Sequence, residues 1–148
     1  GADRICNTAA AIKLVGCPAI VGDIGSATNY DVLDEGGVFI GGSIAPGLET
    51  AALNLFEKAA LLKETALTVP TLAIGKDTVT NLQSGIMLGA IDIIDGMFKR
   101  IQSETSWENP HNIITGGFGE LISPHLQTDH TLSPTLTLDG IRIIFEKQ

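Results

Sequence analysis

The residues best placed to do chemistry follow a short apolar run near the start of the chain. Residues 19–21 are apolar and bounded by glycine, which predicts a buried strand. Asp23 comes after this run, and Ser26 stands three residues later, beyond Gly25. A strand-end carboxylate beside a glycine suits a cation or a phosphate-bound metal, and Ser26 can donate to a phosphate oxygen. The same residues also fit a polar hairpin turn in which Asp23 and Ser26 bond only to local backbone.

A second pair of reactive groups, Asp3 and Arg4, precedes an alanine-rich segment. Asp3 is the one good general-base candidate beside an arginine, because a helix N-terminus favours its ionised form. Arg4 can pair with a substrate carboxylate through two parallel hydrogen bonds. On this pair alone the structural interpretation is favoured: Asp3 caps the helix and Arg4 lies in solvent.

Composition restricts the class of protein. The chain has 148 residues, 44% hydrophobic and 18% charged, which is typical of one globular domain. A formal net charge of −8 argues against a nucleic-acid partner, and no apolar run reaches the roughly 18 residues of a membrane span. Cys6 and Cys17 have no metal spacing, so we expect free thiols in a reducing cytoplasm. The chain begins at Gly1 without an initiator Met, and we expect it to be part of a longer protein.

The elements expected to position these residues begin with an amphipathic helix over residues 5–15, with Asp3 at or near its N-cap. Its expected buried stripe has residues spaced by three or four: Ile5, Ala9, Ile12 and Val15. Three strands should follow as a meander: 19–21, 29–33 and 38–40. The signal Asp-Glu-Gly-Gly at 34–37 predicts a hairpin turn between the last two, and a glycine-rich loop is expected at 41–47.

The second half of the chain predicts more helices and one more buried strand. A helix over 48–62, an extended connector at 66–74 and a long helix over 78–101 are expected first. The expected buried stripe of the long helix is Val79, Leu82, Ile86, Ala90, Ile93, Met97 and Ile101. Gly85 and Gly89 leave a flat patch beside it, where a partner helix could approach. We then expect a loop at 103–110, a strand at 112–115, a glycine-rich helix start at 116–122 and a last helix at 138–147. This order predicts an α/β domain with helices packed on a mixed sheet.

Several motifs that would identify a site fail on inspection. Gly75-Lys76 is not a phosphate-binding P-loop, because Asp77 takes the place of the required Ser or Thr. The glycines at 116–119 do not match the dinucleotide fingerprint. A metal role for the three histidines is disfavoured by their spacing. They are His111, His125 and His130.

Five motifs nevertheless occur in order along nearly the whole chain. They are Gly-Ala-Asp-Arg-Ile at 1–5, Asp-x-Gly-x-Ala-Thr-x-x-Asp at 23–31, Gly-Gly-x-Ile-Ala-Pro-Gly at 41–47, Ile-Gly-Lys-x-Thr at 74–78 with Gln-Ser-Gly-Ile at 83–86, and Thr-Gly-Gly at 115–117. Together they closely resemble the C-terminal half of type III pantothenate kinase, in the actin/hexokinase (ribonuclease H-like) superfamily. The resemblance implies that this chain is the second of two similar domains.

The resemblance also implies roles for individual residues. The motif that binds pantothenate corresponds to Gly1, Ala2, Asp3 and Arg4. Asp3 stands at the position of the proton acceptor, and Asp23 at the position of the ligand to K⁺ or NH₄⁺. Ser26 stands where the family has an ATP-contacting Thr, and Asn29 also replaces a usual Thr. Thr78 stands at the position that touches the substrate across a dimer.

The activity implied is ATP-dependent phosphorylation of pantothenate to 4′-phosphopantothenate, the first step of coenzyme A biosynthesis. The resemblance implies a cytoplasmic homodimer that uses Mg-ATP and a monovalent cation. Kinases of this superfamily hold ATP between two domains, and the Asp-x-Gly-Asn-Thr loop of the first domain does not occur in this sequence. We therefore expect the chain to be the acceptor-substrate half and to be inactive alone. The alternative is a non-catalytic accessory or regulatory relative that keeps the fold for binding or dimerisation.

Overall fold

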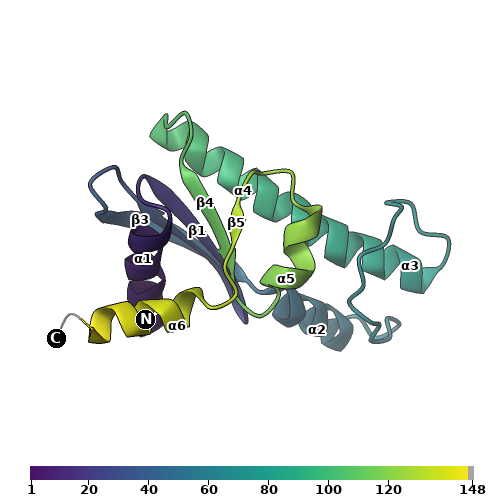
Figure 1. Cartoon of the computed structure of the whole chain (residues 1–148). Coiled ribbons are helices and arrows are strands. Elements are labelled where there is room, and N and C mark those ends of the chain that lie inside the picture. Colours follow the sequence, from purple (N-terminus) through teal and green to yellow (C-terminus); the bar gives the residue numbers. More distant parts are fainter. Residues whose placement is uncertain (147–148) are drawn as a thin grey trace.

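The computed structural model describes residues 1–146, which form a mixed sheet with helices on both faces (Figure 1). The strands are β1 (Ala19–Ile24), β2 (Ala27–Leu33), β3 (Phe39–Pro46), β4 (His111–Thr115) and β5 (Thr131–Leu132). Their order in the sheet is β3-β2-β1-β4-β5. β1, β2 and β3 are antiparallel neighbours, whereas β4 runs parallel to both β1 and β5. The predicted α/β fold class with a mixed sheet is confirmed.

The helices lie before, between and after these strands. They are α1 (Ala2–Leu14), α2 (Leu48–Lys58), α3 (Thr78–Gln83), the π-helix η1 (Ser84–Leu88), α4 (Gly89–Thr105), α5 (Gly119–Ile122), the 3₁₀-helix η2 (Ser123–His125) and α6 (Leu136–Phe145). α3, η1 and α4 follow one another without a break as one long helix. The predicted last helix extends to Lys147, which lies outside the described residues.

Side chains along the central strands point alternately to the two faces of the sheet, which divides the core into two layers. On one face of the sheet, Ile20 and Ile24 of β1 pack with residues of η1 and α4. On the other face, Ala19 and Val21 pack with α1 and α6. Successive side chains of a strand point to opposite faces, so Asp23, two residues after Val21, faces α1. The same alternation places Asp31 on that face, because it lies two residues before the buried Leu33.

The face of α1 that is buried differs from the predicted one. Ile5 is 64% exposed and Ile12 is 44% exposed, so the predicted apolar stripe points largely away from the core. The buried residues of the helix are instead small or polar: Cys6, Asn7, Ala10 and Ala11. The reason is the close approach of α6, where a Cβ atom on Gly140 would overlap the carbonyl of Cys6. Small side chains are needed on both helices at this crossing.

Replacing Gly140 by Ala should destabilise the isolated chain by about 1–3 kcal/mol, as expected for overpacking at a tight contact. The new Cβ would come within 2.7 Å of the Cys6 Cα as well as overlapping its carbonyl, so the two helices must separate. Gly96 of α4 is the matched control, because it is exposed and nothing lies within 4 Å of its Cβ position. There Ala should stabilise by roughly 0.5–1 kcal/mol. Urea unfolding of both variants measures the difference, and equal effects would contradict this packing.

The long helix buries the predicted stripe only in part, although four of its residues pack partly buried against the core: Ile86, Ala90, Met97 and Ile101. Val79 is 50% exposed and Ile93 is 62% exposed, whereas Leu82 is buried as expected. The buried stripe in η1 and α4 is Met87, Ile91, Ile94 and Phe98. The step from Leu82 to Met87 is five residues, because the π-helical turn of η1 adds one residue to the helical repeat. The apolar pattern alone contained both stripes and did not distinguish them.

In the sheet, one prediction is confirmed and two features differ from expectation. The hairpin turn at 34–37 is confirmed, with the Asp34 carboxylate accepting from the backbone N–H groups of Gly36 and Val38 at 2.9 Å. The predicted glycine-rich loop at 41–47 is instead most of β3, since residues 41–46 all pair with β2. Strand β5 was not predicted, because a two-residue strand gives no periodic signal.

Candidate active site

Asp3 lies in the first turn of α1 with its side chain 61% exposed. Asp3 was expected at or near the N-cap, and it lies near it: α1 begins at Ala2 and its N-cap is Gly1, which makes no side-chain cap. Asp3 therefore has helical backbone geometry and is not placed to cap the helix. A carboxylate in the first turn still interacts favourably with the helix dipole, and its exposure leaves it free to meet a bound molecule.

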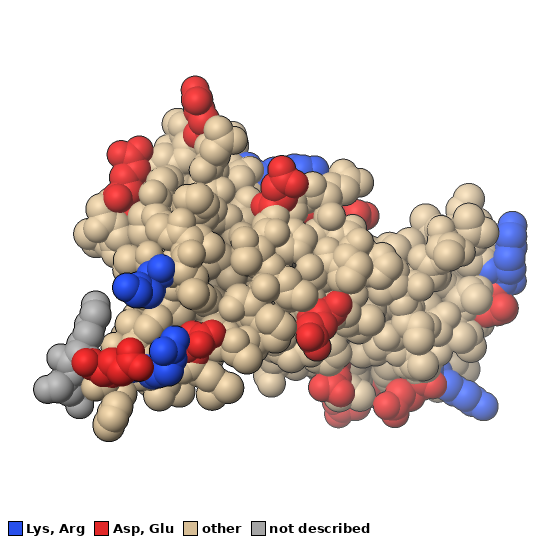
Figure 2. Space-filling view, viewed as in Figure 1, with Lys and Arg blue, Asp and Glu red and all other residues tan. Residues whose placement is uncertain are grey.

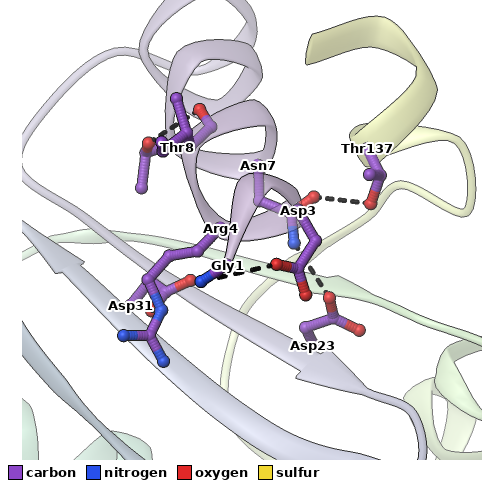
Figure 3. Close-up of polar contacts among 9 residues, drawn as sticks. Gly1, Asp3, Arg4, Asn7, Thr8, Asp23, Asp31 and Thr137 are labelled. Carbon is purple, nitrogen blue, oxygen red and sulfur yellow. Dashed lines mark hydrogen bonds and ion pairs between the residues drawn. The ribbon is translucent and has the colours of Figure 1, made fainter. Parts of the chain in front are cut away.

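The next residue, Arg4, is held by groups from two strands. Its Nε lies 2.8 Å from Oδ1 of Asp31 on β2, and its guanidinium carbon lies 5.7 Å from the ring centroid of Phe39 on β3. The structural interpretation of Arg4 as a solvated side chain is therefore wrong. Figure 3 shows its terminal amino groups pointing away from α1, beyond Asp31. Those amino groups are the part of Arg4 that can hold an anion in a forked geometry.

Asp31 is the most deeply buried acid of this region, with its side chain 2% exposed. Burial raises the pKa of Asp31 to about 6; the Arg4 guanidinium opposes the rise, and the charges of Asp23 and Asp3 add to it. The folded protein thus binds this proton more tightly than the unfolded chain. Ionised Asp31 opposes folding above pH 6, and this cost declines as the pH falls from 6 towards the ordinary value of 3.8.

Asp23 lies near the end of β1 on the face covered by α1, as the prediction of a strand-end carboxylate required. Its Oδ2 accepts a 2.9 Å hydrogen bond from Nδ2 of Asn7. Burial raises the pKa of Asp23, the Asn7 hydrogen bond opposes this, and the charge of Asp3 adds to the rise. Asp3, Arg4, Asp23 and Asp31 are therefore brought together under the first turns of α1 (Figure 3).

The glycine pair after β4 lies against Asp23. β1 and β4 are parallel neighbours with Asp23 opposite Thr115, so their C-terminal ends reach the same edge of the sheet. Gly116 has φ +92°, and a Cβ on it would lie 2.5 Å from Oδ1 of Asp23. Backbone therefore approaches the carboxylate where a side chain would collide. The hydrogen bond from the Phe118 N–H to the Ile24 carbonyl, at 2.9 Å, holds this loop in place.

Ser26 and Thr78 have different positions relative to this cluster. Ser26 is exposed at the tip of the hairpin just beyond β1, and its carbonyl accepts from the Thr50 hydroxyl at 2.8 Å. The predicted hairpin turn is present, and the Ser26 hydroxyl remains available to bind a ligand. Thr78 is the first residue of α3 and is exposed. Figure 1 places α3 at the end of the molecule opposite α1, so this copy of Thr78 does not join Asp3.

The groups around Asp23 fit an oxygen-bound cation better than a cysteine or histidine metal site. Residues 1–146 contain no group of three or more His, Cys, Asp and Glu side chains that could hold a metal ion. His130 is engaged elsewhere, with its ring nitrogens 2.7 Å from the Ser123 hydroxyl and 2.6 Å from the Thr128 carbonyl. Within the described residues, Oδ1 of Asp23 has no hydrogen-bond donor and faces backbone. The free Oδ1 of Asp23 is the kind of oxygen ligand that a hard cation takes.

Several residues of the cluster were not predicted as site residues. The contacts of Asn7 and Thr137 depend on the packing of α1 against α6, which is 130 residues away in sequence. Asp31 belongs to the second motif but was given no role. Gly116 was recognised only as part of a glycine-rich helix start. A useful signal was the spacing of Asn7, one turn after Asp3 on the same helix.

Comparison with solved structures defines the fold. A putative Baf family transcriptional activator from Campylobacter jejuni superposes with a TM-score of 0.69 at 22% identity, covering 99% of this chain and 64% of that one. The Alp12 filament structure gives a TM-score of 0.61 at 10% identity, covering 97% and 53%. The fold is that of an actin-like, ribonuclease H-like domain.

Sequence comparison then gives the family. A sequence model of type III pantothenate kinase matches residues 1–100, and the chain belongs to that family. It is 40% identical over 148 residues to the type III pantothenate kinase of Agathobacter rectalis, covering 57% of it, and 46% identical over 147 residues to that of a Parafrankia species, covering 58%. The chain thus spans a little over half the length of these curated relatives. None of the described helices is long and apolar enough to cross a membrane.

Proposed function

We propose that this chain is the acceptor-substrate half of an ATP-dependent pantothenate kinase that makes 4′-phosphopantothenate for coenzyme A synthesis. The observation that carries this proposal is the placement of the exposed Asp3 and the paired Arg4 over the buried acids Asp23 and Asp31. Membership of the type III pantothenate kinase family supports the same substrate. Phosphoryl transfer needs positioning and charge neutralisation more than covalent chemistry from the protein.

In the proposed reaction, the primary hydroxyl oxygen of pantothenate attacks the γ-phosphorus of ATP. The bond from that phosphorus to the β–γ bridging oxygen breaks, ADP leaves, and the hydroxyl proton passes to the Asp3 carboxylate. The terminal amino groups of Arg4 hold the pantothenate carboxylate, and the backbone at Gly1 and Ala2 lies beside the same substrate. Asp3 is suited to this role because it is exposed and stands one residue before Arg4 on the same helix turn.

The nucleotide end of the proposed site consists of Asp23, Ser26 and the loop at Gly116. A bound K⁺ or NH₄⁺ would supply positive charge for the phosphates of Mg-ATP. Asp23 would hold that cation with its free Oδ1, and the Ser26 hydroxyl would donate to a phosphate oxygen. The chain has a net charge of −8, and Figure 2 shows its basic side chains scattered singly over one face. A polyanion therefore needs a bound cation or a local group such as Arg4.

The proposed active form is a homodimer completed by an N-terminal phosphate-loop domain. Thr78 would then reach the substrate of the neighbouring subunit, which agrees with the position of α3 at the end of the molecule opposite α1 (Figure 1). Gly85 and Gly89 line an apolar groove of about 270 Å³ between the long helix, α2 and the ends of β2 and β3. Nothing lies within 4 Å of a Cβ on either glycine, so this groove is open to a second copy.

A coupled assay of ADP release tests this function. The full-length protein should turn over pantothenate in K⁺ or NH₄⁺ buffer and be slow in Na⁺ alone, because the smaller ion does not match the same oxygens. The isolated 148-residue chain should show no turnover under either condition, since it lacks the phosphate-loop sequence. Equal rates in Na⁺ and K⁺ would contradict the cation role. Pantothenate binding without turnover by the full-length protein would favour the non-catalytic alternative.

A further inference from the structure

Asn7 joins the last helix of the chain to the Asp23 carboxylate. Its side chain is buried, with the residue 1% exposed, and makes two hydrogen bonds. Nδ2 donates to Oδ2 of Asp23 at 2.9 Å, and Oδ1 accepts from the Thr137 hydroxyl of α6 at 2.6 Å. Figure 3 shows these groups in a row, from α6 through α1 to β1. The row links residues that are 130 positions apart in the sequence.

The two ends of the Asn7 amide are chemically different, which makes the order of this row significant. A threonine hydroxyl that donates to Asn7 must meet the amide oxygen, because the amide nitrogen is itself only a donor. The NH₂ group is thereby directed at Asp23, whose carboxylate is acceptor-only when ionised. A flipped amide would place its oxygen against the carboxylate oxygen. The acceptor-only Asp23 carboxylate thus selects the amide orientation, and the Thr137 hydroxyl, by donating to the amide oxygen, holds the other end of the Asn7 side chain in place.

The helix crossing at Gly140 brings Thr137 to this position. Gly140 lies one turn after Thr137 on α6 and lies against the backbone of Cys6, which is the neighbour of Asn7 on α1. A residue three positions away on a helix lies on the same side. The close approach of the two helices at Gly140 therefore carries Thr137 into reach of Asn7. The same crossing accounts for the small side chains on the buried face of α1.

We infer that Asn7 and Thr137 are positioning residues for Asp23, so that α6 fixes the carboxylate at the nucleotide end of the site. With Oδ2 held by Asn7, the other oxygen of Asp23 is left facing the Gly116 loop. The hydrogen-bond row follows from the structure alone. Its effect on the cation rests on the function proposed above. Partners that orient a cation ligand commonly change its affinity by about 10–100-fold when they are removed.

Thr137→Val tests this inference, because valine keeps the shape of threonine and removes the hydroxyl. Thr135→Val is the matched control: Thr135 lies two residues earlier, is exposed, and donates to Asp139 at 2.9 Å instead of to the site. Thr137→Ser should restore the wild-type behaviour, since it returns the hydroxyl. Thermal unfolding of each variant establishes that the fold is retained.

Two measurements are made on these variants. In the isolated chain, the side-chain NH₂ protons of Asn7 should exchange with solvent at least about tenfold faster in Thr137→Val than in wild type, by NMR, and not in Thr135→Val. In the full-length protein, the K⁺ concentration that half-saturates binding of a fluorescent ATP analogue should rise about tenfold in Thr137→Val alone. The second measurement follows nucleotide binding and needs no turnover.

The outcomes test the hydrogen-bond row, the positioning of Asp23 and the proposed function separately. Unchanged Asn7 exchange in Thr137→Val would overturn the hydrogen-bond row. Faster exchange with an unchanged K⁺ requirement would overturn the positioning of Asp23. If the wild-type full-length protein binds pantothenate and ATP but transfers no phosphate, the proposed function fails. Both measurements still test this inference, because neither needs turnover. A variant Thr137→Ser that behaves like Thr137→Val would also contradict it, because the hydroxyl would then not be the group that matters.

Discussion

Replacing Asp3 by Asn is expected to slow phosphoryl transfer to pantothenate by about 10²–10⁴-fold in the full-length enzyme, the range typical for loss of a general base. Asparagine keeps the size of the side chain and its position in the first turn of α1, but its amide cannot accept the hydroxyl proton. Binding of pantothenate should stay largely intact, because Arg4 and its partners Asp31 and Phe39 are unchanged. Steady-state turnover and calorimetric binding measure the two effects separately.

Glu49→Gln provides the matched control for that experiment. Glu49 is also an exposed acid in the first turn of a helix, α2, but it is not part of the cluster around Asp23. Its replacement removes the same kind of favourable helix-dipole interaction, worth roughly 0.3–1 kcal/mol, without removing a proton acceptor. Turnover should therefore match the wild type. A fall of less than about tenfold in Asp3→Asn would show that Asp3 acts only on its helix.

Gly116→Ala should be the most damaging glycine substitution for nucleotide binding. At φ +92° an alanine is strained, at a cost of about 1–2 kcal/mol. Its Cβ would also lie 2.5 Å from Oδ1 of Asp23 and 2.6 Å from the backbone of Ile24. Either the loop or the carboxylate must move, so we expect the Kd of ATP in K⁺ buffer to rise by about 10–100-fold.

The neighbouring residue, Gly117, supplies the control for this loop. It is exposed, and nothing lies within 4 Å of a Cβ built on it. Gly117→Ala should change the free energy of unfolding by no more than about 0.5 kcal/mol and leave the Kd of ATP unchanged. If both variants bind ATP like the wild type, the glycine loop does not shape the Asp23 site. If both lose binding equally, loop flexibility matters and the contact with Asp23 does not.

Much of the fold follows from local sequence. The apolar run at 19–21, the hairpin signal at 34–37 and the strand at 112–115 lie where they were predicted, because strand alternation and turn residues are local properties. Which helix face is buried is not a local property. Ile5 and Ile12 make α1 look amphipathic on one side, yet the tight crossing at Gly140 selects the side with small residues.

The site was predictable to the extent that its residues lie in contiguous motifs. Asp3, Arg4 and Asp23 were identified from their types and from the ordered motifs, and the structure places them side by side. Asp31 holds the Arg4 guanidinium and so supports the assignment of Arg4 as an anion-binding group. The sequence alone did not predict that this polar strand residue is buried. The Asn7–Thr137 contact depends on two helices at opposite ends of the sequence, so no local pattern reports it.

The most direct test of the central claim is the fate of the γ-phosphoryl group. The full-length protein is incubated with γ-labelled ATP, pantothenate, Mg²⁺ and K⁺, and the products are separated and identified by mass. The account predicts that the label appears on the primary hydroxyl of pantothenate, in an amount equal to the ADP formed. Label found only in inorganic phosphate, or no loss of ATP while both substrates bind, would contradict it.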